Sequence, residues 1–341
     1  MRRELTTLIF DPELSEGARN AITTCLRVKP YERVVVITDE ETKEIASSLV
    51  HEVDLVGSPC EVFMLESLSP RPVKEMPQPI LEALAHAQVS IFAAQAKVGE
   101  LGARIQMTAV VNKHRIRHAH MVNINRQIMV EGMRADFHAV DRLSSLLLEK
   151  AIKAKTITVK SRGGTNLKAE FSPYLRWLKT SGLISPDKWG NLPGGEIFTA
   201  PHNVNGVFVV DGVVGDYLCQ KYGDLIKNPL VIEIADNRIA NLHSSNAEFV
   251  RDFSAYTSTD ENSNRVGEFA IGTNIAARNV IGHILQDEKL PGVHIAFGHP
   301  YAEHTGQTWI STTHIDCVGR DFDIWIDDEQ VMRGGSFLVH A

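Results

Sequence analysis

The chain has 341 residues, of which 43% are hydrophobic and 23% are charged, and its formal net charge is −7. This length is typical of two domains, and the composition is that of a globular protein with ample apolar material for a core. The negative charge disfavours non-specific nucleic-acid binding, which depends on neutralising phosphates. No apolar run is long enough to span a membrane or to serve as a signal peptide. The four cysteines are far apart and form no CxxC pair, so we expect a cytoplasmic protein with free thiols.

Strand and helix patterns alternate along residues 1–152, which we expect to form the first domain. Helical spacing or helix-start residues mark EGARNAITTCLRV, TDEETKEIASSLV, PILEALAHA and DFHAVDRLSSLLLEKAIKA, and the apolar runs RVVVIT, CEVFML and VSIFAA predict buried strands. The alternation in ARIQMTAV (103–110) predicts another strand, and the basic run NKHRIRHAH (112–120) is interpreted as a solvated face. Strands that alternate with helices predict an α/β domain with a mostly parallel sheet. No glycine-rich phosphate loop follows a strand, so no nucleotide cofactor is predicted.

The pattern changes in residues 153–341, which we expect to form the second domain. Short alternating strands are predicted in TITVK, TNLKAEF, GVFVVDG, LVIEI, NRIANL and DFDIWI, with one helix in NIAARNVIGHIL (274–285). These elements predict a β-rich α+β domain with an antiparallel or mixed sheet.

Four segments of the second domain place a carboxylate or an imidazole within an apolar run. The segments are NLPGGEIFTAP, RVGEFAIGTN, GVHIAFGHPYAEH and TTHIDCV, and the residues are Glu196, Glu268, His294, His314 and Asp316. Charged side chains in apolar surroundings are costly unless they are paired or bind a metal, and these ligand types suit Zn²⁺, Co²⁺, Mn²⁺ or Fe²⁺. Each residue alone also fits an ordinary role, as an exposed strand pair, a surface glutamate or a core histidine. The pattern by itself leaves both interpretations open.

The charges of these residues bear on the number of ions. Glu196, Glu268 and Asp316 supply three negative charges and a hydroxide supplies a fourth, which two divalent ions would neutralise, with His294 and His314 as neutral ligands. This balance favours two metal ions with a nucleophilic water between them.

The same segments, in the same order, resemble the aminopeptidase T/aminopeptidase S family of metalloaminopeptidases. The matching stretches are NLPGGEIFTAP, NGVFVVDG, GEFAIGTN, VHIAFG with Tyr301 after it, and HIDCV followed by VMRGG, so the likeness covers about residues 155–341. It implies two divalent ions (Zn, Co or Mn) held by Glu196, Glu268, His294, His314 and Asp316, with Asp316 as a candidate bridge. It also implies Tyr301 and Glu196 as catalytic residues, a peptide or other small molecule as substrate, and a homodimer.

A related branch, the 2,5-dihydroxypyridine dioxygenases, is similar over the same region and uses one ferrous ion to open a pyridine ring. In that branch the position of Glu196 is apolar, that of Glu268 is histidine, and that of His294 does not bind the metal. This chain has the peptidase residue at all three positions. We therefore predict a metalloaminopeptidase, with the mononuclear iron dioxygenase as the alternative and a non-catalytic metal-binding protein as a third possibility.

Overall fold

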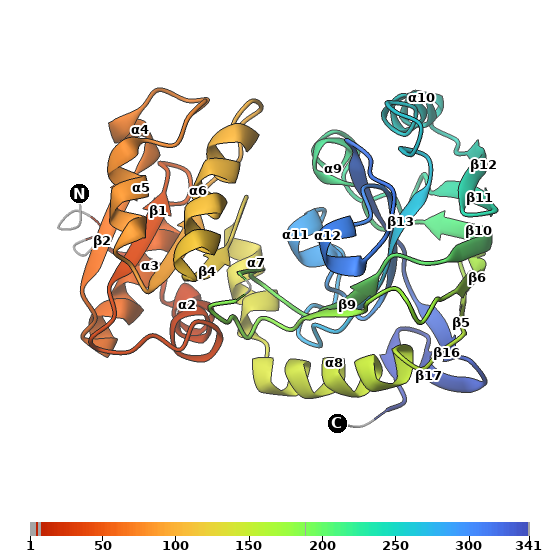
Figure 1. The fold of residues 1–341 in the computed structure, drawn as a ribbon, viewed down its shortest axis with the longest axis horizontal. Coiled ribbons are helices and arrows are strands. Elements are labelled where there is room, and N and C mark those ends of the chain that lie inside the picture. Colours follow the sequence, from red (N-terminus) through yellow and green to blue (C-terminus); the bar gives the residue numbers. More distant parts are fainter. Residues whose placement is uncertain (1–4, 6–7, 188, 340–341) are drawn as a thin grey trace. The chain divides into compact units, whose positions relative to one another are not determined.

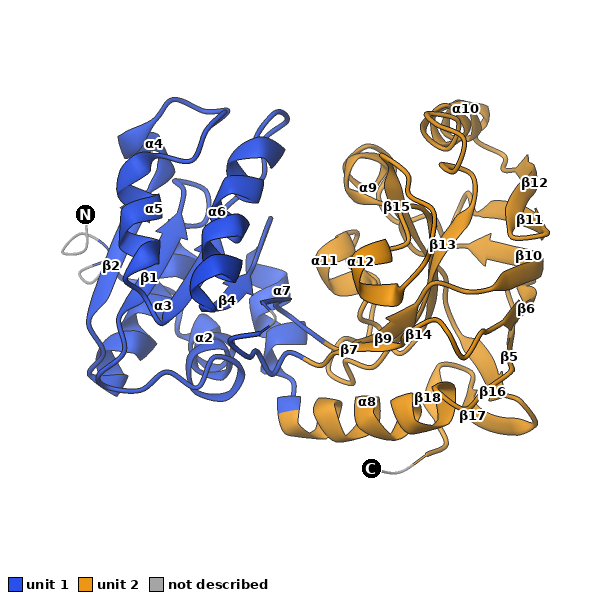
Figure 2. Cartoon of the chain, viewed as in Figure 1, with its two compact units in different colours: residues 1–137, 182–194 blue, residues 138–181, 195–341 orange. Residues whose placement is uncertain are grey.

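The computed structural model describes residues 5, 8–187 and 189–339 (Figure 1). Contacts within the chain define two compact units, residues 1–137 with 182–194 and residues 138–181 with 195–341 (Figure 2). The chain thus leaves the first unit after Phe137 and returns to it for one short excursion. The domain boundary predicted at residues 152 and 153 stays a prediction.

The first unit contains a five-stranded sheet whose strand pairs run parallel, in the order β2-β1-β3-β4-β8. Its strands are β1 (Val34–Thr38), β2 (Cys60–Met64), β3 (Val89–Ala93), β4 (Arg117–His120) and β8 (Gly190–Asn191). Its helices are η1 (Pro12–Leu14), α2 (Ser15–Arg19), the π-helical η2 (Asn20–Cys25), α3 (Lys43–Val56), α4 (Leu65–Leu68), α5 (Gln78–Ala85), α6 (Leu101–His114), α7 (Arg126–Val130) and η3 (Gly132–Arg134). The parallel sheet with intervening helices confirms the predicted fold of this half.

The strand predicted in ARIQMTAV is wrong, because these residues lie inside helix α6. Ala103, Met107 and Val111 recur every four residues and are buried, as expected for one face of a helix. Ile105 contributes to the apparent alternation, but this residue is 58% exposed. The two-residue alternation of apolar residues in this helix therefore includes an exposed residue and does not indicate a strand.

The interpretation of the basic run as a solvated face is wrong for its last residues, which form strand β4. His118 and His120 are buried there, and the Ser90 hydroxyl lies 2.8 Å from Nδ1 of His118. Burial lowers the pKa of His118 to about 3, so this imidazole is neutral. Lys113 and Arg115, earlier in the run, are exposed.

The second unit contains two sheets whose strand pairs run antiparallel, in the orders β12-β11-β10-β6-β5-β16-β17-β18 and β15-β14-β13-β9-β7. The first sheet comprises β5 (Thr156–Ser161), β6 (Asn166–Glu170), β10 (Asn203–Val210), β11 (Leu230–Ala235), β12 (Arg238–His243), β16 (Phe322–Ile326), β17 (Glu329–Arg333) and β18 (Ser336–Phe337). The second comprises β7 (Leu178–Thr180), β9 (Glu196–Thr199), β13 (Val266–Gly272), β14 (Gly292–Gly298) and β15 (His314–Val318). Apolar residues of both sheets, such as Phe208 and Phe269, belong to one hydrophobic core. These sheets confirm the predicted β-rich second half.

The helices of the second unit differ from the prediction. They are α8 (Phe137–Ala151), whose first residue belongs to the first unit, α9 (Asp216–Tyr222), α10 (Ala247–Tyr256), α11 (Ile284–Asp287) and α12 (Ala302–Thr305). The helix predicted at 274–285 is wrong, since only its last two residues are helical. The Asn274 side chain accepts hydrogen bonds from the amides of Ala276 and Ala277, and the Asp287 carboxylate accepts them from Ile281 and His283. These side chains satisfy the backbone amides in a loop instead of a helix.

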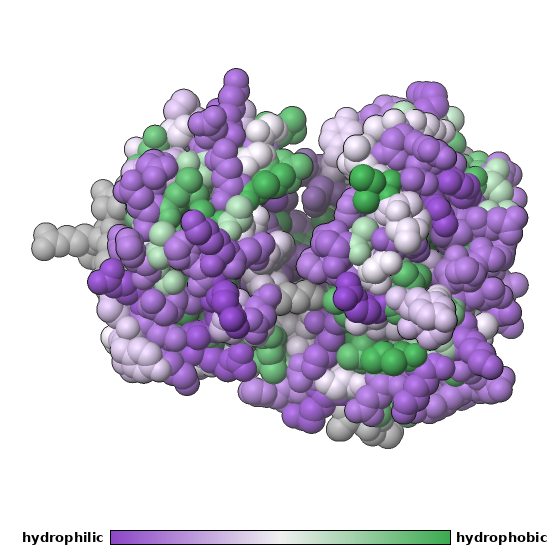
Figure 3. Space-filling view, in the orientation of Figure 1, coloured by the Kyte–Doolittle hydropathy of each residue, from purple (hydrophilic) through white to green (hydrophobic). Residues whose placement is uncertain are grey.

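Polar side chains cover most of the face drawn in Figure 3, and apolar ones lie there in small groups. Within residues 5, 8–187 and 189–339, no helix is both long enough and apolar enough to cross a membrane. The longest of these helices, α8, has 15 residues and carries charged side chains along its length.

Gly298 closes strand β14 at a point that only glycine fits. Its φ is +101°, and a Cβ there would lie 2.2 Å from the Thr313 carbonyl oxygen. We expect Gly298→Ala to lower the free energy of unfolding by about 2 kcal/mol or more, because backbone strain and a clash add together. Chemical denaturation measures the loss. Gly334→Ala is the control, since Gly334 has φ +51° but no atom of the described residues lies within 4 Å of the place that its Cβ would take; an equal loss in both variants would contradict the role of the clash.

Candidate metal centre

The five predicted metal ligands lie on neighbouring strands of the sheet β15-β14-β13-β9-β7 in the second unit, and their side chains face the same way. Ala296 of β14 pairs with Glu268 on one side and with Asp316 on the other, and directly paired residues share a face of the sheet. His294 is two residues from Ala296 and therefore points to the same face. Gly298 of β14 pairs with His314, and Gly272 of β13 pairs with Glu196, so these two ligands lie on the same face as well.

Small residues make room for this polar cluster. Ala270, Gly272, Ala296 and Gly298 occupy the positions on the same face between the polar side chains. The alternate residues of these strands point to the opposite face and belong to the hydrophobic core; they are Ile197, Phe269, Ile271, Val293, Ile295, Phe297, Ile315 and Cys317. One face of the sheet is thus apolar and packed, and the other carries the candidate centre.

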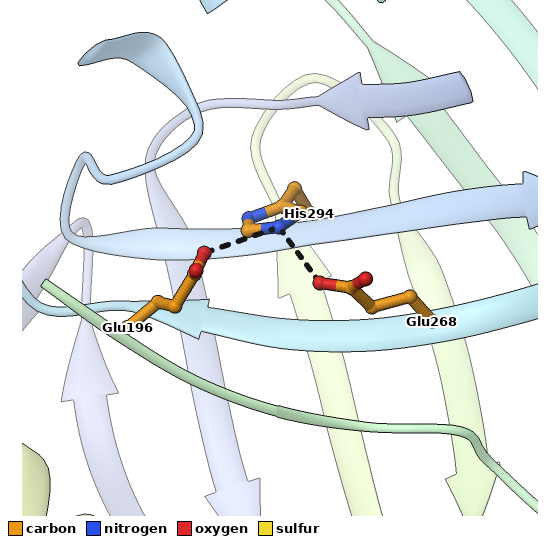
Figure 4. A group of neighbouring side chains, drawn as sticks. All are labelled: Glu196, Glu268 and His294. Atoms are coloured by element: carbon orange, nitrogen blue, oxygen red, sulfur yellow. Dashed lines mark ion pairs between the residues drawn. The ribbon is translucent and has the colours of Figure 1, made fainter. Parts of the chain in front are cut away.

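The inner group consists of Glu196, Glu268 and His294, all buried (Figure 4). Nε2 of His294 lies 3.7 Å from Oε2 of Glu196 and 3.5 Å from Oε1 of Glu268. Both carboxylates point towards the imidazole in Figure 4. One ligand atom from each of the three residues lies within 4.8 Å of the others, which is the spacing of a metal-binding group.

The outer group consists of Glu268, His314 and Asp316, so Glu268 belongs to both groups. Nε2 of His314 lies 3.7 Å from Oε2 of Glu268 and 3.4 Å from Oδ1 of Asp316. Nδ1 of the same imidazole lies 2.9 Å from the His299 carbonyl oxygen and donates a hydrogen bond to it, which directs Nε2 towards the cluster. The side chains of His314 and Asp316 are 20% and 16% exposed, so this group is partly exposed to solvent.

The carboxylates draw positive charge into the cluster. Burial lowers the pKa of His294, but Glu268, Glu196 and Asp316 outweigh burial and raise this pKa to about 9. Burial also lowers the pKa of His314, but Asp316 and Glu268 outweigh burial and raise this pKa to about 10. The cluster therefore favours cations, as expected of a donor set that holds divalent metal ions.

Glu196 is held by one of its two carboxylate oxygens. Oε1 accepts hydrogen bonds from the Thr180 hydroxyl at 2.8 Å and from the Lys289 ammonium at 2.6 Å. Oε2 is buried, has no hydrogen-bond partner among the described residues, and lies on the side of His294. A buried carboxylate oxygen without a partner is costly, and a metal ion would satisfy it. The residues of the inner group therefore fit a divalent ion.

Tyr301 lies beside the outer group. Its ring centroid is 4.9 Å from that of His314, and its backbone adopts a left-handed conformation with φ of 50°, which is uncommon for a residue other than glycine. Its amide donates a hydrogen bond to Nδ1 of His299. Burial and the carboxylates of Glu268 and Asp316 raise the pKa of the Tyr301 phenol well above its ordinary value, so its hydroxyl keeps its proton.

Three residues of the cluster were not predicted from the sequence: Thr180, Glu288 and Lys289. Lys289 Nζ lies 2.7 Å from Oε1 of Glu288 as well as near Glu196. Glu288 and Lys289 fall in the polar stretch QDEKL between two apolar segments, which is typical of an ordinary exposed loop. No local pattern separates them from surface charges, because their burial depends on the approach of a distant strand.

Comparisons with known proteins bear on this geometry. Residues 119–320, more than half of the chain, match the model of the family described as thermophilic metalloprotease (M29). The chain belongs to this family. Membership confirms the predicted resemblance and makes the chain, by class, a metal-dependent peptidase. No curated protein matches.

Two solved structures share the fold of this family member over nearly its whole length. One is wild-type AmpT from Thermus thermophilus, with a TM-score of 0.72 and 16% identity over 97% of this chain and 100% of that one. The other is 2,5-dihydroxypyridine dioxygenase from Pseudomonas putida KT2440, with a TM-score of 0.70 and 15% identity over 95% of this chain and 96% of that one. At these identities the likeness shows the fold alone, so the choice between the two chemistries depends on the side chains.

Proposed function

We propose that the chain is a dinuclear metalloaminopeptidase that releases N-terminal residues from short peptides. One observation carries the proposal: Glu196, Glu268 and His294 form a buried ligand group next to the group of Glu268, His314 and Asp316. Two adjoining groups that share one carboxylate suit two divalent ions, such as Zn²⁺, Co²⁺ or Mn²⁺. Family membership supports the peptidase chemistry.

When bound, two divalent ions supply Lewis-acid polarisation of the scissile carbonyl and a nucleophilic hydroxide at neutral pH. The residues of the chain orient the reaction around them. Tyr301, whose hydroxyl stays protonated beside the outer group, donates a hydrogen bond to the oxyanion that develops on the carbonyl. Of the two candidate bases, Glu196 has one oxygen fixed by Thr180 and Lys289, and only Oε2 remains to bind an ion or accept a proton. The small, partly exposed outer group suits the end of a short peptide.

The dioxygenase alternative needs a single iron ion, for which the outer group alone would suffice. The presence of Glu196 and His294 in the inner group favours the dinuclear peptidase, because a mononuclear site does not require them. The implied homodimer, the cytoplasmic location and a small-molecule or peptide partner stay predictions.

Metal analysis of protein purified without chelators, followed by assays, tests the proposal. We expect about two divalent ions per chain, and release of leucine from a chromogenic amide when Zn²⁺ or Co²⁺ is present. The assay should include a panel of N-terminal residues. One iron ion per chain with opening of 2,5-dihydroxypyridine would establish the alternative, and no turnover on the full panel would contradict the aminopeptidase.

A further inference from the structure

Lys289 places a buried positive charge inside the candidate metal centre. The residue is 2% exposed, and its ammonium lies 2.6 Å from Oε1 of Glu196 and 2.7 Å from Oε1 of Glu288. A lysine is almost never fully buried unless its charge is paired. Its direct contact with a candidate metal ligand indicates an effect on that ligand.

The backbone fixes the lysine in this place. The Lys289 carbonyl oxygen accepts a hydrogen bond from the Asn274 amide, and the Lys289 amide donates one to the Gln286 carbonyl oxygen. Strand β13 approaches the same segment so closely that a Cβ on Gly272 would lie 2.0 Å from the Leu290 carbonyl oxygen. The glycine is therefore needed for the contact that brings Lys289 to the end of β13, where Gly272 pairs with Glu196.

The ammonium weakens Glu196 as a metal ligand in two ways. It occupies Oε1 together with the Thr180 hydroxyl, so only Oε2 remains for an ion. It also neutralises much of the carboxylate charge at short range in a buried setting, where Coulomb interactions are strong. A second cation at the inner group must therefore bind a carboxylate whose charge is already shared with the ammonium, which Glu288 also contacts.

In the part of the chain that the structure describes, no carboxylate of the outer group contacts the Lys289 ammonium directly. Among the residues that the structure describes, neither Glu268 nor Asp316 forms an ion pair with a lysine or an arginine; their ion-pair partners are His294 and His314. The two groups therefore differ in the fixed charge that an incoming ion meets.

We propose that Lys289 makes the two metal positions unequal, so that the first divalent ion binds at Glu268, His314 and Asp316 and the second binds more weakly at the group containing Glu196. This inference rests on the proposed two-metal function. It makes the dinuclear state, and with it the peptidase activity, depend on the concentration of free metal ion. Lys289 is thus a positioning residue that acts through Glu196.

Equilibrium dialysis of the full chain against increasing Zn²⁺, with metal analysis of the protein, tests the inference without an activity assay. We expect two binding steps whose dissociation constants differ by about tenfold or more. Two ions bound with equal affinity would overturn the inference and leave the dinuclear proposal intact. One ion bound at every Zn²⁺ concentration, in this chain and in the lysine variant below, would overturn the dinuclear proposal itself.

The variant Lys289→Met removes the charge and keeps most of the side-chain volume. We expect the second dissociation constant to fall by about tenfold or more, with the first nearly unchanged. Lys168→Met is the matched control, because Lys168 is exposed on β6 and pairs with Glu170, away from the ligand groups; its two binding steps should equal those of the unaltered chain. An unchanged second step in Lys289→Met would overturn the inference.

Loss of the lysine leaves Glu288, whose side chain is only 12% exposed, without its partner and so threatens folding. The double variant Lys289→Met with Glu288→Gln removes both charges and guards against this outcome. It should also tighten the second binding step, because Oε1 of Glu196 is freed from the ammonium in both variants. Thermal unfolding of each metal-free variant shows that the protein measured is folded. A double variant that folds but binds the second ion as weakly as the unaltered chain would contradict the role of Lys289.

Discussion

Glu268→Gln is expected to abolish peptidase activity and to lower the metal content of a chain that remains folded. The reason is that Glu268 belongs to both ligand groups, with Oε1 3.5 Å from Nε2 of His294 and Oε2 3.7 Å from Nε2 of His314. Glutamine has the same shape but no charge, so both positions lose an anionic ligand. Loss of the several kcal/mol that metal ions contribute to transition-state stabilisation corresponds to a fall in kcat/KM of about 10³-fold or more.

Metal content, kcat/KM and circular dichroism of the purified variant check this expectation together. Glu233→Gln is the matched control, because Glu233 lies on strand β11 of the same unit and is exposed. The control should keep both its metal and its activity. Activity and metal content that both survive in Glu268→Gln would show that the site is assigned to the wrong residues.

Tyr301→Phe is expected to lower kcat by about 10²–10³-fold, which is the usual cost of removing one donor to a developing oxyanion. The hydroxyl is the only group lost, and the ring remains, with its centroid 4.9 Å from that of His314 and 5.9 Å from that of Phe198. The metal content and the thermal stability should stay close to those of the unaltered chain. This pattern separates Tyr301 from Glu268, whose replacement removes metal as well as activity.

Single-turnover kinetics and metal analysis of Tyr301→Phe distinguish a catalytic role from a structural one. Tyr174→Phe is the control, since Tyr174 is 89% exposed. A kcat within about threefold of normal in Tyr301→Phe, on the scale of ordinary surface substitutions, would contradict the role of the hydroxyl. A loss of metal would instead show that Tyr301 supports the ligands.

Much of the fold follows from local pattern. The buried runs that form β1, β2 and β3 alternate with helical stripes, which is enough to predict a parallel sheet. The elements predicted from the sequence do not include helix α10, although its signals are present: Asn246 caps it by accepting hydrogen bonds from two amides, and Phe249 and Phe253 are buried one turn apart. The cap and this spacing together are enough to predict the helix. The two wrong predictions have other causes. At 103–110 the apolar residue Ile105 is exposed, so the apparent strand pattern does not report burial. At 274–285 side-chain hydrogen bonds to the backbone amides hold the segment as a loop.

The residue pattern predicts the ligand types, and the resemblance that it carries predicts the family, which the family match confirms. Glu196, Glu268, His294, His314 and Asp316 stand out because each interrupts an apolar strand, and burying a charge in such a frame requires a partner or a metal ion. How these residues come together depends on long-range packing. The register of four strands places them on one face, shares Glu268 between two groups, and brings Lys289 to Glu196. Strand register and the packing of a distant loop depend on residues far apart in the sequence. The local pattern of polar and apolar residues therefore does not predict them.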